Sequence, residues 1–328
     1  MKKRFVVVTG DSEGLGNAAL HSLLRLNPHT QVIGLSRRPR EQVDRIDRLT
    51  PSQAARYRHL RVDFSDAEQR AKVAADILSS IRESRGSLAA LLLVNGTGYI
   101  DTDVEKNPEL RELMETLNLT APQELIEGLR PVLEREAPIF YFSGLVTHPN
   151  IHDPVLRIHG EIKKRAAALL RGQLGDRLKI MMPGAYRTDM LTKNIVRENA
   201  LLEWFAIPLS DPYVPGGISD LVARHALRPH HRFPKAVIRP RMCHLLVTLN
   251  DAEGVIASLP GAIRRAARGV LAETGQTDAQ HDARVRYFKE HQLYGESFPY
   301  DSILSDRLWP AWASKAYAAS MRSARLLN

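Results

Sequence analysis

The sequence predicts an α/β fold, a Rossmann-like, doubly wound parallel sheet with helices on both faces, followed by a C-terminal helical extension. Three observations support this prediction. Short apolar runs alternate with longer amphipathic segments, the first apolar run leads directly into a glycine-rich turn, and the links between segments are short. Strands and helices that alternate in this way are typical of parallel sheets covered on both faces.

The expected elements follow one another along the chain. The β-branched and apolar runs predict strands at 4–9, 31–36, 58–63, 88–94, 138–143, 178–182 and 235–238. The amphipathic segments predict helices at 17–24, 66–85, 108–135, 155–172 and 218–227. Pro122 and Pro131 predict that the helix over 108–135 is interrupted, because proline removes a backbone donor and clashes with the preceding turn.

Length and composition indicate a soluble globular protein. The chain has 328 residues, of which 44% are hydrophobic and 25% charged, which fits one large domain with an appendage. We expect a nucleotide-binding domain over 1–250, with a substrate lid at 186–213 where the periodicity weakens, and a helical extension over 251–328. The single cysteine, Cys243, excludes an intramolecular disulfide framework. Without a signal-peptide pattern or about 20 consecutive apolar residues, we expect a cytoplasmic protein with no integral membrane segment.

The chain is basic, with a formal net charge of +9. No recognisable nucleic-acid module occurs, and the basic residues are spread along the sequence. This balance favours a phosphate-rich cofactor and an anionic or carrier-bound small-molecule substrate over a nucleic acid. A generally solvated basic surface explains it equally well.

The glycine-rich turn has the features of a site for a nucleotide diphosphate. Gly10 allows the strand to turn sharply, Gly14 removes a side chain where a ligand would approach, and Gly16 lets helix and strand pack closely. The helix that follows offers backbone N–H groups and the positive end of its dipole to phosphates.

The residues after the second expected strand indicate which dinucleotide would bind. An acidic side chain there would accept hydrogen bonds from a ribose 2′-hydroxyl, whereas arginine suits a 2′-phosphate. This chain has Arg37 and Arg38, which favours NADP(H) over NAD(H).

Together with Thr9, the glycine-rich turn resembles the Thr-Gly-x-x-x-Gly-x-Gly motif of the short-chain dehydrogenase/reductase family. Further motifs occur in the family's order: Asp63-Phe64, Asn95-Gly96-Thr97-Gly98, Asn118, and the Pro-Gly-x-x-x-Thr segment at 183–188. The resemblance covers residues 1 to about 250. It implies that the cofactor is bound by Gly10, Ser12, Glu13, Gly14, Leu15, Gly16, Arg37, Arg38, Asp63, Phe64, Asn95, Gly96, Lys163, Pro183, Gly184 and Thr188.

The resemblance also implies a catalytic set, which departs from the family's pattern. The family pairs a serine with Tyr-x-x-x-Lys and uses a helical asparagine for proton relay. Ser143 and Asn118 match, but no tyrosine follows between Tyr141 and Tyr186. The best substitute is His159-x-x-x-Lys163, at a longer interval from the serine than is usual in the family. At the family's usual interval from the serine, the tyrosine position would fall on Leu156 and the lysine position on Gly160. Lys164 is a second candidate for the catalytic lysine beside Lys163.

Three interpretations of this segment remain open. In the first, His159 is the acid and base, since an imidazole ordinarily titrates near neutrality. In the second, the acceptor is an activated C=C or C=N bond, and the proton comes from water, Asn118 or the substrate. In the third, the chain binds NADP(H) as a regulatory or structural subunit without hydride transfer. His148, His152 and His159 could suggest a metal site, but the first two lie in a loop with Pro149 between them, so we expect no metal.

The sequence therefore predicts an NADP(H)-dependent oxidoreductase that reduces a carbonyl, or an activated C=C or C=N bond, of a small organic substrate. The divergent catalytic segment suggests a role in secondary metabolism. The resemblance further implies a homo-oligomer, either a dimer or a tetramer.

Overall fold

A computed structural model describes residues 3–144, 156–181, 213, 218–227 and 237–238. In this part of the chain, seven parallel strands form one sheet in the order β3-β2-β1-β4-β5-β6-β7. Their bounds are β1 (Arg4–Thr9), β2 (Thr30–Ser36), β3 (Tyr57–Arg61), β4 (Ser87–Leu93), β5 (Ile139–Phe142), β6 (Leu178–Met181) and β7 (Val237–Ile238). The predicted doubly wound α/β fold is confirmed.

The strand order changes direction between β1 and β4. From β1 the chain runs outward to β2 and β3, then crosses back to β4 and continues to β7 on the other side. In open parallel sheets, ligands bind beyond the carboxyl ends of the strands where the order reverses in this way. The topology therefore predicts a ligand site beyond the carboxyl ends of β1 and β4.

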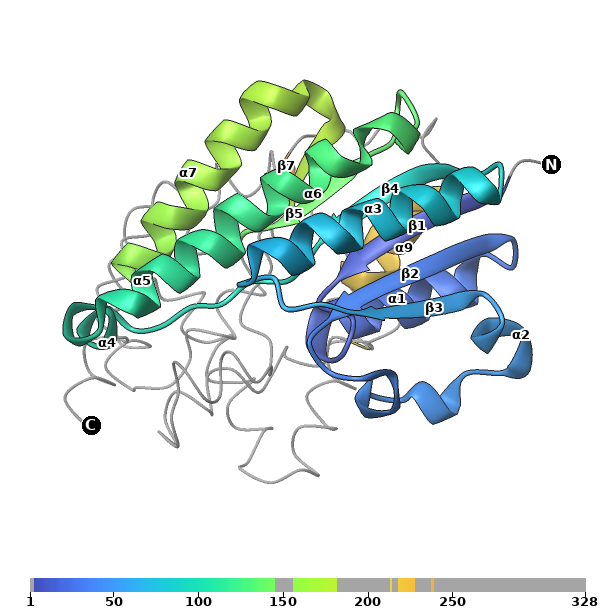
Figure 1. The fold of residues 1–328 in the computed structure, drawn as a ribbon, viewed down its shortest axis with the longest axis horizontal. Coiled ribbons are helices and arrows are strands. Elements are labelled where there is room, and N and C mark those ends of the chain that lie inside the picture. The colour runs from blue at the N-terminus through green and yellow to red at the C-terminus, as the bar shows by residue number, and fades with distance from the viewer. Residues whose placement is uncertain (1–2, 145–155, 182–212, 214–217, 228–236, 239–328) are drawn as a thin grey trace, which may run out of the picture.

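Helices cover both faces of the sheet (Figure 1). The α-helices are α1 (Gly14–Leu26), α2 (Pro51–Ala54), α3 (Ala67–Glu83), α4 (Asp101–Lys106), α5 (Pro108–Glu115), α6 (Ala121–Leu129), α7 (Arg157–Leu174) and α9 (Ile218–Leu227). Short 3-10 turns lie at η1 (Arg40–Gln42), η2 (Ile46–Arg48), η4 (Arg130–Val132) and η6 (Gly175–Arg177), and a π-helical turn, η3 (Thr116–Thr120), joins α5 to α6. Helices α3, α6 and α7 pack on one face, and α1 and α9 on the other.

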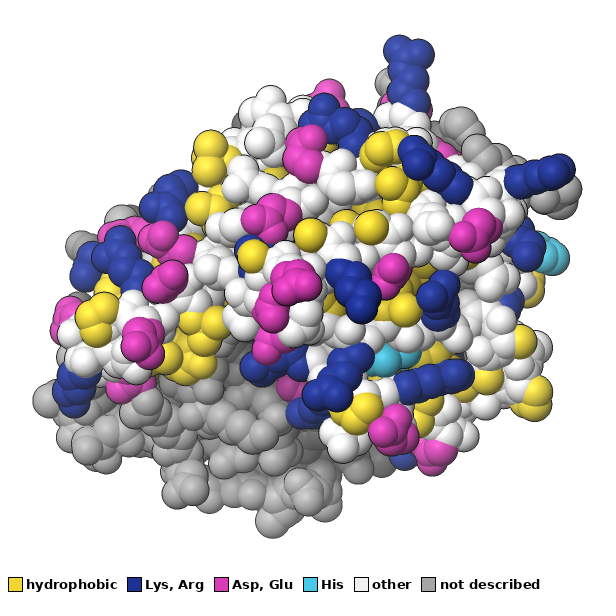
Figure 2. Space-filling view, in the orientation of Figure 1, with side chains coloured by type: hydrophobic (Ala, Val, Ile, Leu, Met, Phe, Trp, Pro, Cys, Tyr) yellow, Lys and Arg dark blue, Asp and Glu magenta, His cyan; other side chains and the backbone are white. Residues whose placement is uncertain are grey.

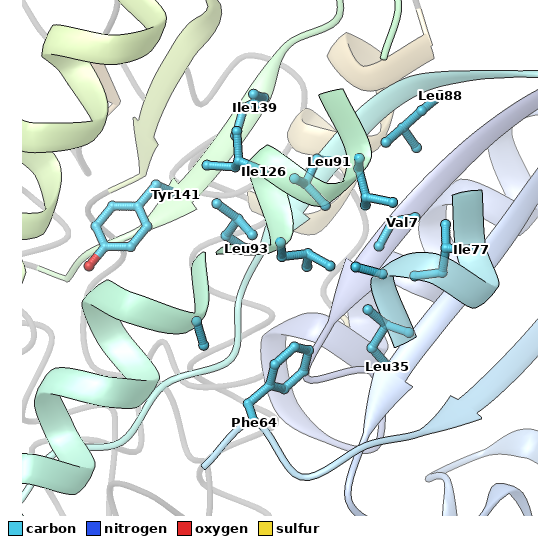
Figure 3. Packing of buried hydrophobic residues seen from close by; sticks show 14 of the residues in the cluster. Val7, Leu35, Phe64, Ile77, Leu88, Leu91, Leu93, Ile126, Ile139 and Tyr141 are labelled. Carbon is cyan, nitrogen blue, oxygen red and sulfur yellow. The ribbon is translucent and has the colours of Figure 1, made fainter. Parts of the chain in front are cut away.

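The apolar residues of the strands form the two halves of the core. On the first face the side chains of Val7, Leu35, Leu91 and Ile139 pack against Ile77 and Ile126 from the helices, as Figure 3 shows. On the second face the opposite side chains of the same strands pack against α1 and α9. Every residue of β4 is buried, which is why its sequence is an uninterrupted apolar run rather than an alternating one.

Capping residues explain where two of the helices begin. Asp66 accepts a hydrogen bond from the backbone N–H of Gln69 at the start of α3. Asn107 accepts one from Glu109 at the start of α5, where Pro108 occupies a position that needs no donor. These signals are local, and the predicted starts at 66 and 108 are confirmed within two residues.

The expected helix over 108–135 is divided into α5, the π turn, α6 and η4. Pro122 has no backbone N–H to donate to the carbonyl of Asn118. The N–H of Ala121 donates to the carbonyl of Thr116, five residues earlier, which is the π-helical pattern. The short helices α2 and α4 were not predicted. The expected lid over 186–213, apart from Tyr213, and the expected extension over 251–328 lie outside the described residues.

Candidate active site

The glycine-rich turn after β1 lies directly against the end of β4. Gly10 has a positive φ of 69°, and a Cβ there would lie 3.2 Å from the backbone N of Asn95. A Cβ on Gly16 would overlap the carbonyl oxygen of Gly10, so this glycine allows α1 to pack on the turn. These contacts explain the glycines at 10 and 16 in physical terms.

Thr9 connects the end of β1 to the end of β4 by hydrogen bonds. Its Oγ1 accepts hydrogen bonds from the backbone N–H groups of Val94, at 2.9 Å, and Asn95, at 3.0 Å, and donates one to the carbonyl oxygen of Leu92. The threonine is fully buried. The sequence marked Thr9 as part of the motif, and the structure shows that its hydroxyl fixes the point where the strand order reverses.

Arg37 and Arg38 have different surroundings. The Arg38 guanidinium forms an ion pair of 2.6 Å with Glu13 in the glycine-rich turn. The Arg37 side chain is exposed and forms no ion pair with another described residue. Lys and Arg side chains gather over the part of the surface where β3 lies (Figure 2). Of the two arginines, Arg37 is therefore the one whose charge is not already balanced within the described residues.

Asp63 and Phe64 follow β3, also at the carboxyl edge. One carboxylate oxygen of Asp63 accepts from the backbone N–H and the hydroxyl of Ser65. The ring of Phe64 is buried in the hydrophobic core, and its carbonyl accepts a hydrogen bond of 2.8 Å from Arg70. The Phe64 side chain, which was predicted to contact the cofactor, thus packs into the core.

Asn118 is placed by the π turn and is completely buried. Its side-chain amide donates to the carbonyl oxygens of Thr97 and Met114, each at 2.8 Å. The backbone carbonyl of Asn118 receives no helical hydrogen bond from Pro122, because proline has no N–H. It accepts a hydrogen bond of 2.9 Å from the Tyr141 hydroxyl instead. The sequence did not single out Tyr141, because its contact crosses from β5 to another element.

Lys163 and His159 lie one helical turn apart on the inner side of α7, and both are buried. The Lys163 ammonium lies 4.9 Å from the centre of the Tyr141 ring. A Cβ at Gly96 would be 3.1 Å from Lys163 Nζ, and one at Gly98 would be 3.0 Å from His159 Nδ1. Two glycines of the predicted Asn-Gly-Thr-Gly turn thus make room for the two polar side chains.

The two candidate lysines lie on different sides of α7. Lys164 is exposed, whereas Lys163 is on the buried side. The alternative positions are Leu156, which precedes α7, and Gly160, and neither supplies a polar side chain. His159 and Lys163 are therefore the polar pair that α7 presents to the carboxyl edge.

Burial changes the protonation of this pair. Burial, together with the positive charge of the nearby Lys163, lowers the pKa of His159 to about 3. Burial also lowers the pKa of Lys163 to about 7. The expectation that His159 titrates near neutrality is wrong, because burial keeps this imidazole neutral at physiological pH.

Asp101 holds the start of α7 in place. Its two carboxylate oxygens accept from the backbone N–H groups of Ile158, at 2.9 Å, and Arg157, at 3.2 Å. The residue belongs to α4, so it caps a helix that begins more than fifty residues later in the sequence. Sequence reasoning missed it, since capping motifs are sought next to the helix they cap.

The remaining predicted residues are only partly described. Ser143 directly follows β5, and its backbone N–H donates to Met181 at 2.8 Å. Pro183, Gly184 and Thr188 lie outside the described residues. Tyr213, at the end of the expected lid, donates a hydrogen bond of 2.7 Å to Asn17 and lies under the Arg45 guanidinium.

Five buried side-chain atoms at the carboxyl edge make no hydrogen bond to another described residue. They are Asp11 Oδ1, Ser36 Oγ, Asn95 Nδ2, Asn118 Oδ1 and His159 Nδ1. Buried polar atoms in native proteins are nearly always paired, so a group of unpaired ones needs an explanation. They extend from the end of β2, past β1 and β4, to α7. A long polar ligand lying across these elements would supply the partners.

The described residues contain no group of three or more His, Cys, Asp or Glu side chains placed to hold a metal ion. His148 and His152 are not among them. None of the helices that the structure describes combines the length and the apolar composition needed to cross a bilayer.

No family model and no curated protein matches the sequence. Solved structures do match the fold. A dehydrogenase/reductase from Sinorhizobium meliloti has a TM-score of 0.57 at 22% identity, covering 72% of this chain and 92% of that one. A metagenomic short-chain oxidoreductase in complex with NADP has a TM-score of 0.53 at 19% identity, covering 72% and 96%.

A third similar structure is the 3-oxoacyl-[acyl-carrier protein] reductase from Brucella melitensis in complex with NAD. Its TM-score is 0.55 at 16% identity, and the match covers 69% of this chain and 90% of that one. The chain thus has the fold found in short-chain dehydrogenases and reductases.

Proposed function

We propose that this protein is an NADP(H)-dependent oxidoreductase of the short-chain dehydrogenase/reductase type. It would reduce a carbonyl, or an activated C=C or C=N bond, of a small organic substrate, which the net charge of +9 suggests is anionic or carrier-bound. The observation that carries the proposal is the row of five unpaired buried polar atoms along the carboxyl edge. A dinucleotide has the length, and in its ribose hydroxyls, amino and carboxamide groups and phosphate oxygens both the donors and the acceptors, that such a row would need.

The proposed cofactor orientation follows from the turn and the two ends of the row. The diphosphate would lie against the backbone over 10–16, at the start of α1, where positive φ values at Gly10 and Gly14 shape the turn. The adenosine end would lie near Ser36 and Asp63, and the nicotinamide end near Asn95, Ser143 and Lys163. The similar structures include complexes with both NADP and NAD, so they do not decide between the two cofactors.

NADP(H) is proposed because of Arg37. Its exposed guanidinium follows β2 directly and suits a 2′-phosphate. Arg38 is engaged by Glu13 at 2.6 Å. We therefore assign the direct phosphate contact to Arg37 and a supporting role to Arg38.

The cofactor would supply the hydride, and this chain's residues would hold the substrate and handle the proton. Ser143 would orient the acceptor group beside the nicotinamide. His159, neutral at physiological pH, suits a hydrogen-bonding role rather than that of a cationic acid. Lys163 has a pKa of about 7 and is the member of the pair that can exchange a proton near neutrality. Asn118 would complete the proton path through its unpaired Oδ1.

The remaining assignments are also proposals. We propose a nucleotide-binding domain over 1–250 and a helical extension over 251–328, and a cytoplasmic dimer or tetramer. A role in secondary metabolism is consistent with the missing tyrosine between 141 and 186.

The cofactor assignment is tested by a charge reversal with a matched control. In Arg37→Glu the Kd for NADPH, followed by nucleotide fluorescence, should rise at least about tenfold while the Kd for NADH changes little. Arg58→Glu makes the same charge change on β3, where Arg58 donates to Ser80, and should change neither Kd more than about threefold. Equal effects of the two variants would overturn the assignment.

The reaction is tested by supplying substrates. A reductase consumes NADPH when given a panel of ketones, enones and imines, and the loss of absorbance identifies the acceptor class. Tight NADPH binding without consumption across the panel would favour the alternative of a binding or regulatory subunit.

A further inference from the structure

A buried polar cluster lies beside the proposed adenosine end and has no part in the reaction described above. Val8, Gly34 and His59 are aligned across the three strands β1, β2 and β3. A Cβ on Gly34 would overlap the Asp11 carboxylate. The missing side chain therefore opens a gap in the middle strand through which Asp11, from the turn after β1, reaches β3.

Two residues of β3 bind this carboxylate. Asp11 Oδ2 accepts hydrogen bonds from the Tyr57 hydroxyl, at 2.5 Å, and from His59 Nδ1, at 2.9 Å. Asp11 is fully enclosed, and the His59 side chain is 3% exposed. Because these two residues are two apart in a strand, their side chains lie on the same face.

The other nitrogen of His59 binds the backbone. His59 Nε2 lies 2.8 Å from the carbonyl oxygen of Arg38. A carbonyl oxygen only accepts, and so does a carboxylate, so both ring nitrogens donate and the ring is an imidazolium. Asp11 and His59 thus form a buried ion pair, and the Nε2–H of His59 donates to the turn that follows β2.

Several side-chain contacts hold that turn, and three of them come from His59, Arg61 and Glu13. His59 binds the Arg38 carbonyl, Arg61 Nε binds the Arg37 carbonyl at 2.9 Å, and Glu13 binds the Arg38 guanidinium. Of these three contacts, only the one from His59 is made by a buried side chain. It is therefore less free to move than the exposed contact from Arg61 and the half-buried contact from Glu13, and it fixes the distance of the turn from the sheet.

We propose that His59, oriented by Asp11, is a specificity-positioning residue: it holds the turn that carries Arg37 at the position where the guanidinium meets a cofactor 2′-phosphate. This inference rests on the proposed function, since it assigns the cofactor selectivity of that same site. His59 touches no substrate or reacting atom, so its effect is on the ratio of the NADH and NADPH dissociation constants.

The protonation of His59 follows from its neighbours. Burial lowers its pKa, but the hydrogen bond and negative charge of Asp11, together with the Arg38 carbonyl, outweigh this and raise the pKa above 6.5 overall. The charged and titratable groups that face it are Asp11, Tyr57, Arg38 and Arg40. The raised pKa favours the imidazolium that the two accepting oxygens require.

Two amide variants separate the bonds of His59. In His59→Gln the amide nitrogen falls near the place of Nε2 and can still donate to the Arg38 carbonyl. In His59→Asn it falls near Nδ1 and can donate only to Asp11. We expect His59→Gln to keep the wild-type ratio of NADH to NADPH dissociation constants within about threefold, and His59→Asn to lower it about tenfold by weakening NADPH alone.

The controls distinguish the possible failures. If the wild-type protein binds neither cofactor, or if Arg37→Glu leaves NADPH binding unchanged, the proposed function fails. If the wild-type protein is selective through Arg37 but His59→Asn and His59→Gln have the same ratio, the positioning role fails and the function stands. A merely structural role would lower the unfolding temperature of both variants without separating their ratios.

A measurement on the wild-type protein covers the case in which neither variant folds. From pH 7 to 9.5 the 2′-phosphate stays dianionic, since its second pKa is about 6. As the His59 ring loses its proton with rising pH, the ratio of the NADH to NADPH dissociation constants should fall. Deprotonation of Lys163 would change both constants alike and leave their ratio unchanged. A ratio that stays constant while NMR shows the His59 ring losing its proton would overturn the proposal.

Discussion

Lys163 donates a hydrogen bond of 2.8 Å from its Nζ to the carbonyl oxygen of Phe142, and this bond ties the middle of α7 to the end of β5. The ammonium is enclosed, with the Tyr141 ring beside it. The contact places a titratable group where the proposed nicotinamide end would lie.

The first prediction concerns pH and stability. Burial lowers the pKa of Lys163 from 10.5 to about 7, so between these values the unfolded chain holds the proton and the folded chain does not. Stability should therefore rise with pH over this window, by up to about 1.4 kcal/mol per unit. We expect the difference in free energy of unfolding between wild type and Lys163→Met to grow in favour of wild type from pH 7.5 to 9.5 in urea titrations. Parallel pH profiles would contradict the lowered pKa.

The second prediction concerns His159 and the pH dependence of activity. With a pKa of about 3, His159 should contribute no ionisation to the kcat profile between pH 5 and 8. His159→Gln should lower kcat about a hundredfold through the lost hydrogen bonding, with the Kd for NADPH within about threefold of wild type. His29→Gln, an exposed histidine after α1, is the control and should leave kcat unchanged. Unchanged kcat in His159→Gln would remove His159 from the mechanism.

The third prediction concerns the cap that Asp101 provides for α7. Asp101→Ala should lower the free energy of unfolding by about 1–2 kcal/mol, because it leaves two N–H groups at the start of α7 unpaired. Glu105→Ala, an exposed position on the same short helix, should cost less than about 0.5 kcal/mol. Chemical denaturation measures both. Equal costs would show that the carboxylate does not cap α7.

The fourth prediction concerns the Tyr141 hydroxyl and Pro122. Tyr141→Phe should lower the free energy of unfolding by about 1–3 kcal/mol, because the backbone carbonyl of Asn118 loses the hydroxyl donor that takes the place of a helical N–H. Pro122→Ala restores an N–H four residues after that carbonyl. In the double variant the cost of Tyr141→Phe should therefore fall, giving a measurable coupling in a double-mutant cycle. Additive effects would show that the two groups do not share the carbonyl.

Sequence patterns predicted the elements whose signals are local. The apolar run of β4, the start of α3 next to Asp66 and the glycines at 10 and 16 each depend on neighbours within a few residues. The choice of Lys163 over Lys164 needed only the phase of α7, which packing decides. The short helix α4 was missed because six residues give too little periodicity.

Contacts between distant segments could not be predicted. The link from Asp11 to His59 passes over Gly34 and depends on the register of three strands. The low pKa of His159 depends on enclosure by other elements rather than on residue type. Asp101 and Tyr141 likewise act on segments far along the chain. In each case the partner is set by tertiary packing, which residue spacing does not encode.

The π turn at Thr116–Thr120 has a consequence for comparing this chain with others. Such a turn contains one residue more than an uninterrupted α-helix would hold over the same length. An alignment procedure that discourages gaps inside helices will therefore pair either the residues before the turn or those after it with the wrong partners. For this chain, a correct alignment to a protein with a continuous helix places a single-residue insertion beside Asn118.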